Sequence, residues 1–157
     1  MSFVIGGRRA RLHDDEGAVA AWGRALAKRP DYLEAGYNRA LALERLGRMR
    51  DAVTAYEAVL RYHPSHHDAR VRRGLALLGA GDLSAAEEAF RALASEPGTA
   101  DAGLLGLARV ALARGDLPTT ERLLSNMEQR GGWAKQIAEL RQQLEEARRA
   151  QPSARMQ

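Results

Sequence analysis

The stretch Arg45-Leu46-Gly47-Arg48-Met49 recurs at a constant interval, first as Gly79-Ala80-Gly81-Asp82-Leu83 and then as Ala113-Arg114-Gly115-Asp116-Leu117. A glycine lies at the centre of each copy. Because glycine reaches left-handed backbone conformations without a steric penalty, it is typical of the residue that ends a helix. The three stretches therefore predict a repeated helix–turn–helix unit, and their interval matches a known repeat period of about 34 residues.

The same period carries a small residue that is followed four positions later by a bulky one. The small residues are Ala18, Ala52, Ala86 and Thr120, and the bulky residues are Trp22, Tyr56, Phe90 and Leu124. Residues four apart lie on one face of a helix, so the small residue favours close approach of a neighbour and the large one fills the gap beside it. Further positions keep the period: Ala40, Gly74 and Ala108 in the first helix of each unit, and Pro30, Pro64 and Pro97-Gly98 at the unit boundaries.

This period, with its small, large and glycine positions, resembles that of the tetratricopeptide repeat family. The clearest copy of its motif is Ala40, Gly47, Ala52, Tyr56 and Pro64. The tryptophan that often opens the family's pattern is replaced by Gly36, Arg70 and Leu104, and the leucine after it by Arg39 and Arg73 but kept as Leu107. The resemblance covers roughly residues 12–130. It implies an all-α fold, a right-handed α-solenoid of helical hairpins.

The pattern predicts helices at residues 15–28, 33–46, 49–62, 67–79, 83–95, 100–114 and 117–130. These helices form repeats at about 33–64, 67–98 and 101–130. A degenerate first hairpin is expected at 1–30, with an opening helix within residues 2–12, where Gly6-Gly7 costs about 1 kcal/mol per glycine. We expect one repeat domain over residues 1–150 and a disordered tail at 151–157.

A different kind of segment follows Gly131-Gly132. Apolar residues lie along one side of a predicted helix at 133–150, namely Trp133, Ile137, Leu140 and Leu144. Charged and polar residues fill the opposite side: Lys135, Glu139, Arg141, Gln142, Glu145, Glu146 and Arg149. Such a helix is typical of the C-terminal capping helix that covers the last apolar face of a repeat array. The alternative is a helix that swaps or dimerises through the same stripe.

The composition excludes several classes of protein. The 157 residues contain no cysteine, so disulfides, thiolate nucleophiles and cysteine-based zinc sites are absent. The sequence contains no glycine-rich phosphate loop and no nucleophile-elbow motif, and we therefore expect neither an enzyme nor a cofactor. No stretch of the sequence is long and apolar enough to span a bilayer, which favours a cytoplasmic protein.

One short segment is rich in possible metal ligands. It reads His63-Pro64-Ser65-His66-His67-Asp68 and falls at the predicted boundary between two hairpins. Its spacing matches no recognised ligand motif, and adjacent histidines at a helix start point apart. We expect no metal site here, and a turn with a helix cap instead.

The resemblance implies that the first helix of each hairpin faces a concave groove. This gives a predicted partner-binding set of Tyr37, Asn38, Leu41, Glu44, Arg45, Val71, Arg72, Leu75, Leu78, Leu105, Arg109 and Leu112. Apolar side chains edged by guanidinium groups suit an amphipathic helix or an extended peptide with an acidic residue. Some of these leucines have an alternative role in packing between hairpins.

These features favour a scaffold or adaptor that binds a peptide or helix of another protein. One alternative is a self-assembling homo-oligomer that joins through incomplete terminal hairpins. The least favoured is a nucleic-acid binder, for which the net charge of +4 is small. Its arginines would be Arg8, Arg9, Arg11, Arg70, Arg72 and Arg73.

Overall fold

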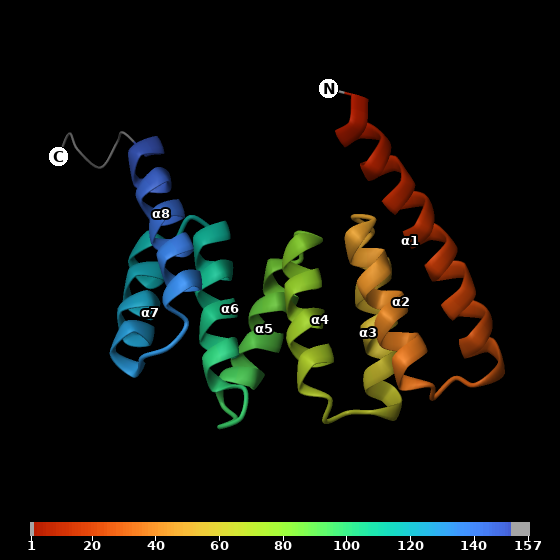
Figure 1. The fold of residues 1–157 in the computed structure, drawn as a ribbon. Helices are drawn as coiled ribbons and strands as arrows, with labels where there is room; N and C mark the ends of the chain where they lie inside the picture. Colours follow the sequence, from red (N-terminus) through yellow and green to blue (C-terminus); the bar gives the residue numbers. More distant parts are fainter. Residues whose placement is uncertain (1, 152–157) are drawn as a thin grey trace. The chain divides into compact units, whose positions relative to one another are not determined.

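A computed structural model of the chain describes residues 2–151, with side chains from Asp14 onward. The described residues form eight α-helices and no strand, which confirms the predicted all-α class (Figure 1). The helices are α1 (Ser2–Lys28), α2 (Leu33–Arg45), α3 (Met49–Tyr62), α4 (His67–Gly79), α5 (Leu83–Ala94), α6 (Ala100–Ala113), α7 (Leu117–Arg130) and α8 (Ala134–Ala150). From α2 onward, each bound lies within one residue of the prediction. No helix in residues 2–151 has the length and apolar character needed to cross a membrane.

The first hairpin was predicted wrongly. Helix α1 is continuous from Ser2 to Lys28, so no separate opening helix forms within residues 2–12. The repeat places the first turn glycine one period before Gly47, and the chain has His13 there. Without a residue suited to the left-handed turn, the helix continues through this position.

The helices divide into two compact units. The N-terminal unit runs to Gly81 and contains α1–α4, and the C-terminal unit starts at Asp82 and contains α5–α8. The boundary falls at the turn glycine of the predicted repeat 67–98, so the two helices of that repeat belong to different units. The assignment of residues 1–150 to a single repeat domain, like the disordered tail, stays a prediction; residues 152–157 lie outside the described part of the chain.

The predicted turn glycines have left-handed backbones. Gly47, Gly81 and Gly115 have φ angles of 75°, 81° and 76°. At the first of these turns, Arg48 N donates to Leu43 O and Gly47 N donates to Glu44 O, both at 2.9 Å. This pair of bonds is the Schellman arrangement, which satisfies carbonyls that the end of a helix leaves free. The recurring glycines thus end the first helix of each predicted repeat.

The core of the N-terminal unit lies where α2 and α3 meet their neighbours. Tyr56 and Ala52 of α3 are fully buried, as predicted from the small-then-large spacing, and pack with Ala40 and Leu43 of α2. The corresponding Trp22 of α1 is only partly buried. This copy of the pair is therefore less enclosed than the copy on α3.

In the C-terminal unit, α5 and α6 approach closely through two glycines. A Cβ atom on Gly106 would lie 2.1 Å from the Phe90 ring, and one on Gly103 would lie 2.3 Å from the Ala94 backbone nitrogen. Both distances are too short for any side chain. Phe90 is fully buried as a result, which agrees with its predicted position in the repeat.

Helix α8 covers the end of the C-terminal unit. Ile137, Leu140 and Leu144 are buried against α6 and α7, and this side of α8 is therefore used within the chain. Trp133 was predicted to join this stripe, but it is 39% exposed. It precedes α8 with a φ angle of 59°, after Gly131 and Gly132, which both have positive φ. The left-handed turn directs its indole away from the stripe.

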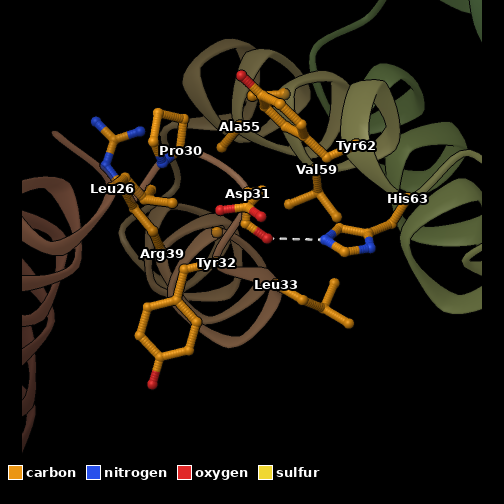
Figure 2. Close-up of a pocket in the computed structure, with 12 residues that line it drawn as sticks. Leu26, Pro30, Asp31, Tyr32, Leu33, Arg39, Ala55, Val59, Tyr62 and His63 are labelled. Carbon is orange, nitrogen blue, oxygen red and sulfur yellow. Dashed lines mark hydrogen bonds between the residues drawn. The ribbon is translucent and has the colours of Figure 1, made fainter. Parts of the chain in front are cut away.

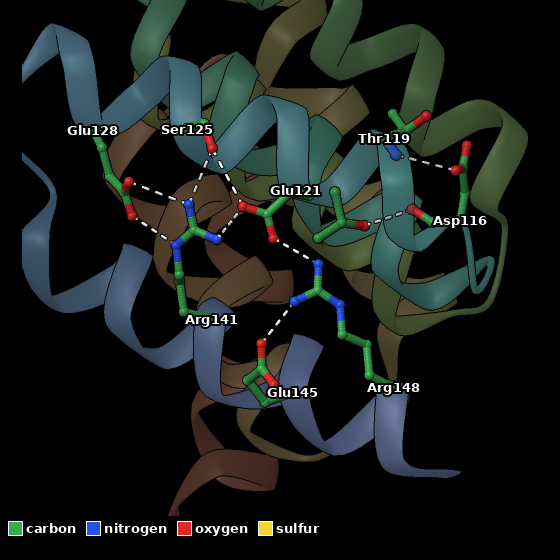
Figure 3. A network of polar contacts seen from close by, with 9 residues as sticks. Asp116, Thr119, Glu121, Ser125, Glu128, Arg141, Glu145 and Arg148 are labelled. Carbon is green, nitrogen blue, oxygen red and sulfur yellow. Dashed lines mark hydrogen bonds and ion pairs between the residues drawn. The ribbon is translucent and has the colours of Figure 1, made fainter. Parts of the chain in front are cut away.

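A polar network also holds α8 to α7 (Figure 3). Arg141 donates from Nε to Glu128 at 2.7 Å, from Nη1 to Glu121 at 2.5 Å and from Nη2 to Ser125 at 3.1 Å. Arg148 donates to the second carboxylate oxygen of Glu121 at 2.8 Å. The prediction that Arg141 lies on the exposed side of the helix was therefore wrong, because this arginine faces α7.

Candidate partner-binding surface

In the N-terminal unit, α2 and α4 are joined by a cluster of polar side chains. Arg72 of α4 donates from Nε to the Tyr37 hydroxyl at 3.2 Å and from Nη1 to Glu44 Oε2 at 3.1 Å. The other oxygen of Glu44 accepts from the Tyr56 hydroxyl at 2.6 Å. Three of the predicted binding residues, Tyr37, Glu44 and Arg72, are thus brought together around one carboxylate.

Contacts within the cluster keep the Tyr56 phenol neutral and the Arg72 guanidinium charged. Burial raises the pKa of the Tyr56 phenol, and its hydrogen bond to Glu44 raises that pKa further, so the phenol stays neutral and donates. Burial lowers the pKa of Arg72, but the bond to Tyr37 and the charge of Glu44 outweigh this, and the net shift is upward. The Arg72 side chain is 42% exposed, and its Nη2 makes no hydrogen bond to a described residue, which leaves this nitrogen free to donate to a bound group.

Half-exposed side chains flank this cluster. On α2, Leu41 lies one helical turn from Tyr37, and Asn38 makes no hydrogen bond within the described part of the chain. On α4, the half-exposed residues are Val71, Leu75 and Leu78. The two helices thus present apolar side chains, a free amide and a guanidinium on neighbouring faces.

Arg45 was predicted to line the same groove, but it is engaged with α1. It donates from Nε to Asp15 Oδ1 at 2.8 Å and from Nη2 to the same oxygen at 2.7 Å. The hydrogen bond to Asp15 raises the pKa of Arg45. Its main role in the structure is to attach α1 to α2.

The three predicted residues of α6 belong to the C-terminal unit and are placed differently. Leu105 is 7% exposed and packs in the core with Leu124 and Leu144, which is the packing role left open for such leucines. Leu112 packs at the edge of that core. Arg109 is half-buried, and its Nε is buried without a hydrogen-bond partner in the described part of the structure.

The histidine segment has structural roles. His66 Nδ1 accepts a hydrogen bond from Ala69 N at 3.0 Å and so caps α4, and His63 Nε2 lies 2.9 Å from the Asp31 carbonyl oxygen. Among the described residues, no group of three His, Asp or Glu side chains is placed to hold a metal ion.

Two of the six arginines of the nucleic-acid alternative have carboxylate partners. Arg72 pairs with Glu44, and Arg73 pairs with Glu57 at 3.0 Å. The side chains of Arg8, Arg9 and Arg11 lie outside the described part of the structure. The described arginines therefore give no support to a row of free cations for phosphates.

The hydrogen bond of Tyr56 within the polar cluster, and a ring that lies beside the cluster, were not predicted from the sequence. The ring of Tyr56 was predicted as a packing element, but a buried tyrosine hydroxyl also needs a hydrogen-bond partner, and Glu44 supplies it. The ring of His66 lies 5.3 Å from that of Tyr37, between centroids. The need of a buried hydroxyl for a hydrogen-bond partner could have suggested the contact between Tyr56 and Glu44. No signal in the sequence suggests the contact between His66 and Tyr37.

A hollow lies in the N-terminal unit, between the α1–α2 loop and the ends of α2 and α3 (Figure 2). The space between its lining residues, including the part that is open to solvent, is about 310 Å³. Most of its lining is apolar or aromatic: Leu26, Pro30, Tyr32, Leu33, Gly36, Ala55, Ala58, Val59 and Tyr62. The polar lining residues are Asp31, Arg39 and His63.

Known proteins support the predicted family. The sequence profile described as Tetratricopeptide repeat matches residues 37–103. A tetratricopeptide repeat protein from Parabacteroides merdae ATCC 43184 has a similar crystal structure, with a TM-score of 0.72 and 23% identity over 90% of this chain and 57% of that one. A MamA RS-1 ArsTM double mutant is similar with a TM-score of 0.62 and 22% identity over 95% of this chain and 93% of that one. No curated protein matches the chain.

The profile match over residues 37–103, the turn glycines and the fold agree: this part of the chain matches the tetratricopeptide repeat model, and the described chain has an all-α helical-repeat fold. The repeat spacing in the sequence had indicated the resemblance to this family and, through it, the fold. This family supports a general role as a protein–protein interaction scaffold, and its fold is typical of proteins without catalytic activity. The chain spans 57% of the length of the Parabacteroides protein.

Proposed function

We propose that the chain is an adaptor that binds a peptide or an amphipathic helix of a partner protein over α2 and α4. The observation that carries this proposal is the polar cluster on these helices. Glu44 fixes Arg72 in place, while 42% of the Arg72 side chain remains exposed beside Leu41, Val71 and Leu75. A guanidinium that is already oriented loses less conformational freedom when it binds a carboxylate.

The chemistry of the surface favours a particular kind of ligand. Leucine and valine side chains offer apolar contact, Asn38 offers an amide to a peptide backbone, and Arg72 offers Nη2 to an acidic side chain. An amphipathic helix or extended segment with one acidic residue beside apolar ones meets all three requirements. Arg109 and Leu112 of α6 are proposed as a separate contact within the C-terminal unit.

The test begins with affinity capture of the partner from the native source and its identification by mass spectrometry. Binding of the purified partner is then compared between the wild type and Leu75→Glu, with Thr54→Glu as a control that adds the same charge at an exposed position of α3. We expect at least a tenfold loss of affinity for Leu75→Glu, because a carboxylate replaces an apolar contact, and little change for the control. A partner that binds Leu75→Glu as tightly as the wild type contradicts the assignment of this surface.

A variant in the C-terminal unit extends the test. Arg109→Glu reverses the charge of the half-buried arginine on α6. It should lower the affinity for the same partner if that partner also contacts α6. Helicity measured by circular dichroism should be unchanged in all three variants. Loss of binding with a loss of helicity would show a folding defect, and Arg109→Gln then serves as the milder substitution.

A further inference from the structure

Two arginines occupy equivalent positions of consecutive repeats. Arg39 lies on α2, and Arg73 lies one repeat period later on α4. Arg73 has a carboxylate partner on the preceding helix, because its Nε and Nη2 donate to Glu57 Oε1 at 3.1 and 3.0 Å. The residue equivalent to Glu57 one period earlier is Gly23 of α1. The partner that the chain supplies to Arg73 is therefore missing for Arg39.

The structure places Gly23 directly beside Arg39. A Cβ atom added to Gly23 would lie 3.6 Å from Arg39 Nε, which is an ordinary van der Waals distance. Arg39 Nε is buried and has no hydrogen-bond partner among the described residues. Buried donors without an acceptor are rare in folded proteins because their desolvation is not compensated. Arg39 thus lacks an acceptor at the point where the next repeat provides one.

Arg39 also lines the hollow between the α1–α2 loop and the ends of α2 and α3. In Figure 2 its side chain runs beside Leu26 and Pro30, which line the same hollow. Gly36 leaves room at the position where the family often has a tryptophan, and Val59 fills part of that room, since a Cβ on Gly36 would be 2.8 Å from it. An apolar recess and a guanidinium whose buried Nε has no partner among the described residues are therefore next to each other.

The charges around the hollow favour an acidic ligand. Asp31 is the only carboxylate in the lining, and it lies 3.6 Å from the exposed Arg29. Glu34 accepts a weak hydrogen bond from the Tyr32 hydroxyl at 3.4 Å. Arg39 has no ion pair with a described residue, so the uncompensated charge at this hollow is positive.

This hollow is separate from the surface proposed above. Successive residues of a helix are rotated by about 100°, so Arg39 lies about 160° around α2 from Tyr37 and from Leu41. A ligand of Arg39 contacts the α1 side of the helix, with the ends of α2 and α3, and leaves the polar cluster around Glu44 free.

We propose that this hollow is a second binding site, which takes an acidic segment of a partner protein: one apolar side chain enters the recess and the carboxylate of a neighbouring Asp or Glu pairs with Arg39. The carboxylate supplies the acceptor that Glu57 supplies to Arg73. The apolar side chain contacts Leu26, Val59 and the exposed ring of Tyr62. Either group alone would bind weakly, and their adjacency gives the site its specificity.

Three forms of the full chain test this site: the wild type, Gly23→Glu and Gly23→Ala. Gly23→Glu supplies an internal carboxylate to Arg39, whereas Gly23→Ala adds only a methyl group and keeps Arg39 unpaired. Each form is used to select binders from a phage library of random seven-residue peptides. We expect the wild type and Gly23→Ala to enrich peptides in which Asp or Glu adjoins Leu, Ile, Met or Phe, and Gly23→Glu not to enrich them.

The most enriched peptide is then labelled with fluorescein and titrated by fluorescence anisotropy. We expect at least a tenfold weaker Kd for Gly23→Glu and for Arg39→Leu, and a Kd within twofold of the wild type for Gly23→Ala and Leu75→Glu. Arg39→Leu is conservative in packing because the third repeat has Leu107 at this position. The Leu75→Glu result separates this site from the α2–α4 surface, so the two proposals can fail independently.

Two results overturn the proposal. One is that selection on the wild type yields no acidic–apolar peptides beyond those selected on Gly23→Glu. The other is that the selected peptide binds Gly23→Glu and the wild type with the same Kd. Melting temperatures of all variants that are close to or above the wild-type value ensure that a loss of binding reports on the site and not on unfolding.

Discussion

The first and last helices of the chain are attached to their neighbours in different ways. In α8, Ile137, Leu140 and Leu144 are buried. Two arginines of α8 donate hydrogen bonds to carboxylates of α7: Arg141 to Glu121 and Glu128, and Arg148 to Glu121 (Figure 3). In α1, no described side chain is buried, and its ion pair with α2 joins Asp15 to Arg45. The polar and apolar groups that α8 presents to α7 are paired or buried, whereas at the α1 interface Arg39 Nε has no acceptor among the described residues.

This difference teaches where a repeat protein of this kind has unused binding chemistry. A helix that covers the end of a repeat array must bury its apolar face and pair the charged side chains that face its neighbour. Helix α8 does both, since its apolar residues are buried and Arg141 and Arg148 pair with carboxylates of α7. The α1 interface has a glycine at the position where the following repeat has a carboxylate. Departures from the repeat within one chain therefore identify candidate sites more sharply than the repeat itself.

The largest effect that tests this comparison is expected from cavities in the two interfaces. Leu144→Ala removes a fully buried side chain of α8 and should lower the free energy of unfolding by about 2–5 kcal/mol. Leu26→Ala removes a half-buried side chain of α1 and should cost about 1 kcal/mol. Urea denaturation followed by circular dichroism measures both. Equal losses for the two variants would show that α1 is held as firmly as α8.

A smaller difference is expected from the arginines that hold each helix. Arg141→Met keeps the aliphatic stem but removes bonds to Glu121, Ser125 and Glu128, and should cost about 1 kcal/mol, a value reduced by the partial exposure of the network. Arg45→Met removes a single ion pair, with Asp15, from an arginine that is more exposed than Arg141, and should cost a few tenths of a kcal/mol. The same urea measurements apply. A larger cost for Arg45→Met than for Arg141→Met would contradict the comparison.

Most of the fold could be predicted because its causes are local. The turn glycines, the alternation of Ala52 with Tyr56 and the boundary prolines repeat at fixed spacing, and each has a backbone or packing reason that acts within a few residues. The first hairpin was predicted from the period alone. It failed because the chain has His13 where the turn needs a glycine.

The candidate site could be predicted only in part. Helical spacing and the family resemblance selected Tyr37, Glu44 and Arg72 correctly as neighbours on one surface. They could not show that Arg45 reaches Asp15, that Leu105 is buried or that Arg39 lacks a partner, because these depend on side-chain contacts between helices. Arg39 and Arg73 look alike in the sequence, and the residues that distinguish them, Gly23 and Glu57, lie on the preceding helix in each case.

Gly23→Ala should stabilise the protein modestly, in contrast to the destabilising substitutions Leu144→Ala, Leu26→Ala, Arg141→Met and Arg45→Met. Alanine favours the helical interior by about 1 kcal/mol relative to glycine, and the added methyl group would contact only Arg39 Nε at 3.6 Å. We therefore expect a gain of about 0.5–1 kcal/mol in the free energy of unfolding. A loss of stability would mean that α1 lies closer to α2 at this point than the structure shows.

The smallest effect concerns pH. Hydrogen bonds from Arg141 hold the pKa values of Glu121 and Glu128 below their ordinary value of 4.5. Their stabilising contribution is therefore present above about pH 4.5 and is lost as the pH falls through the lowered pKa values. Melting temperatures between pH 7 and pH 3 should fall less steeply for Arg141→Met than for the wild type. Parallel curves would show that the network does not contribute to the acid dependence.

The missing carboxylate at Gly23 is tested most directly by a pair of double-mutant cycles on the free energy of unfolding. One combines Gly23→Glu with Arg39→Leu, and the other combines Glu57→Gly with Arg73→Leu. We predict a favourable arginine–glutamate coupling in both cycles, between a few tenths and about 1 kcal/mol. Coupling in the second cycle with none in the first would contradict the claim that Gly23 is the position from which Arg39 lacks its partner.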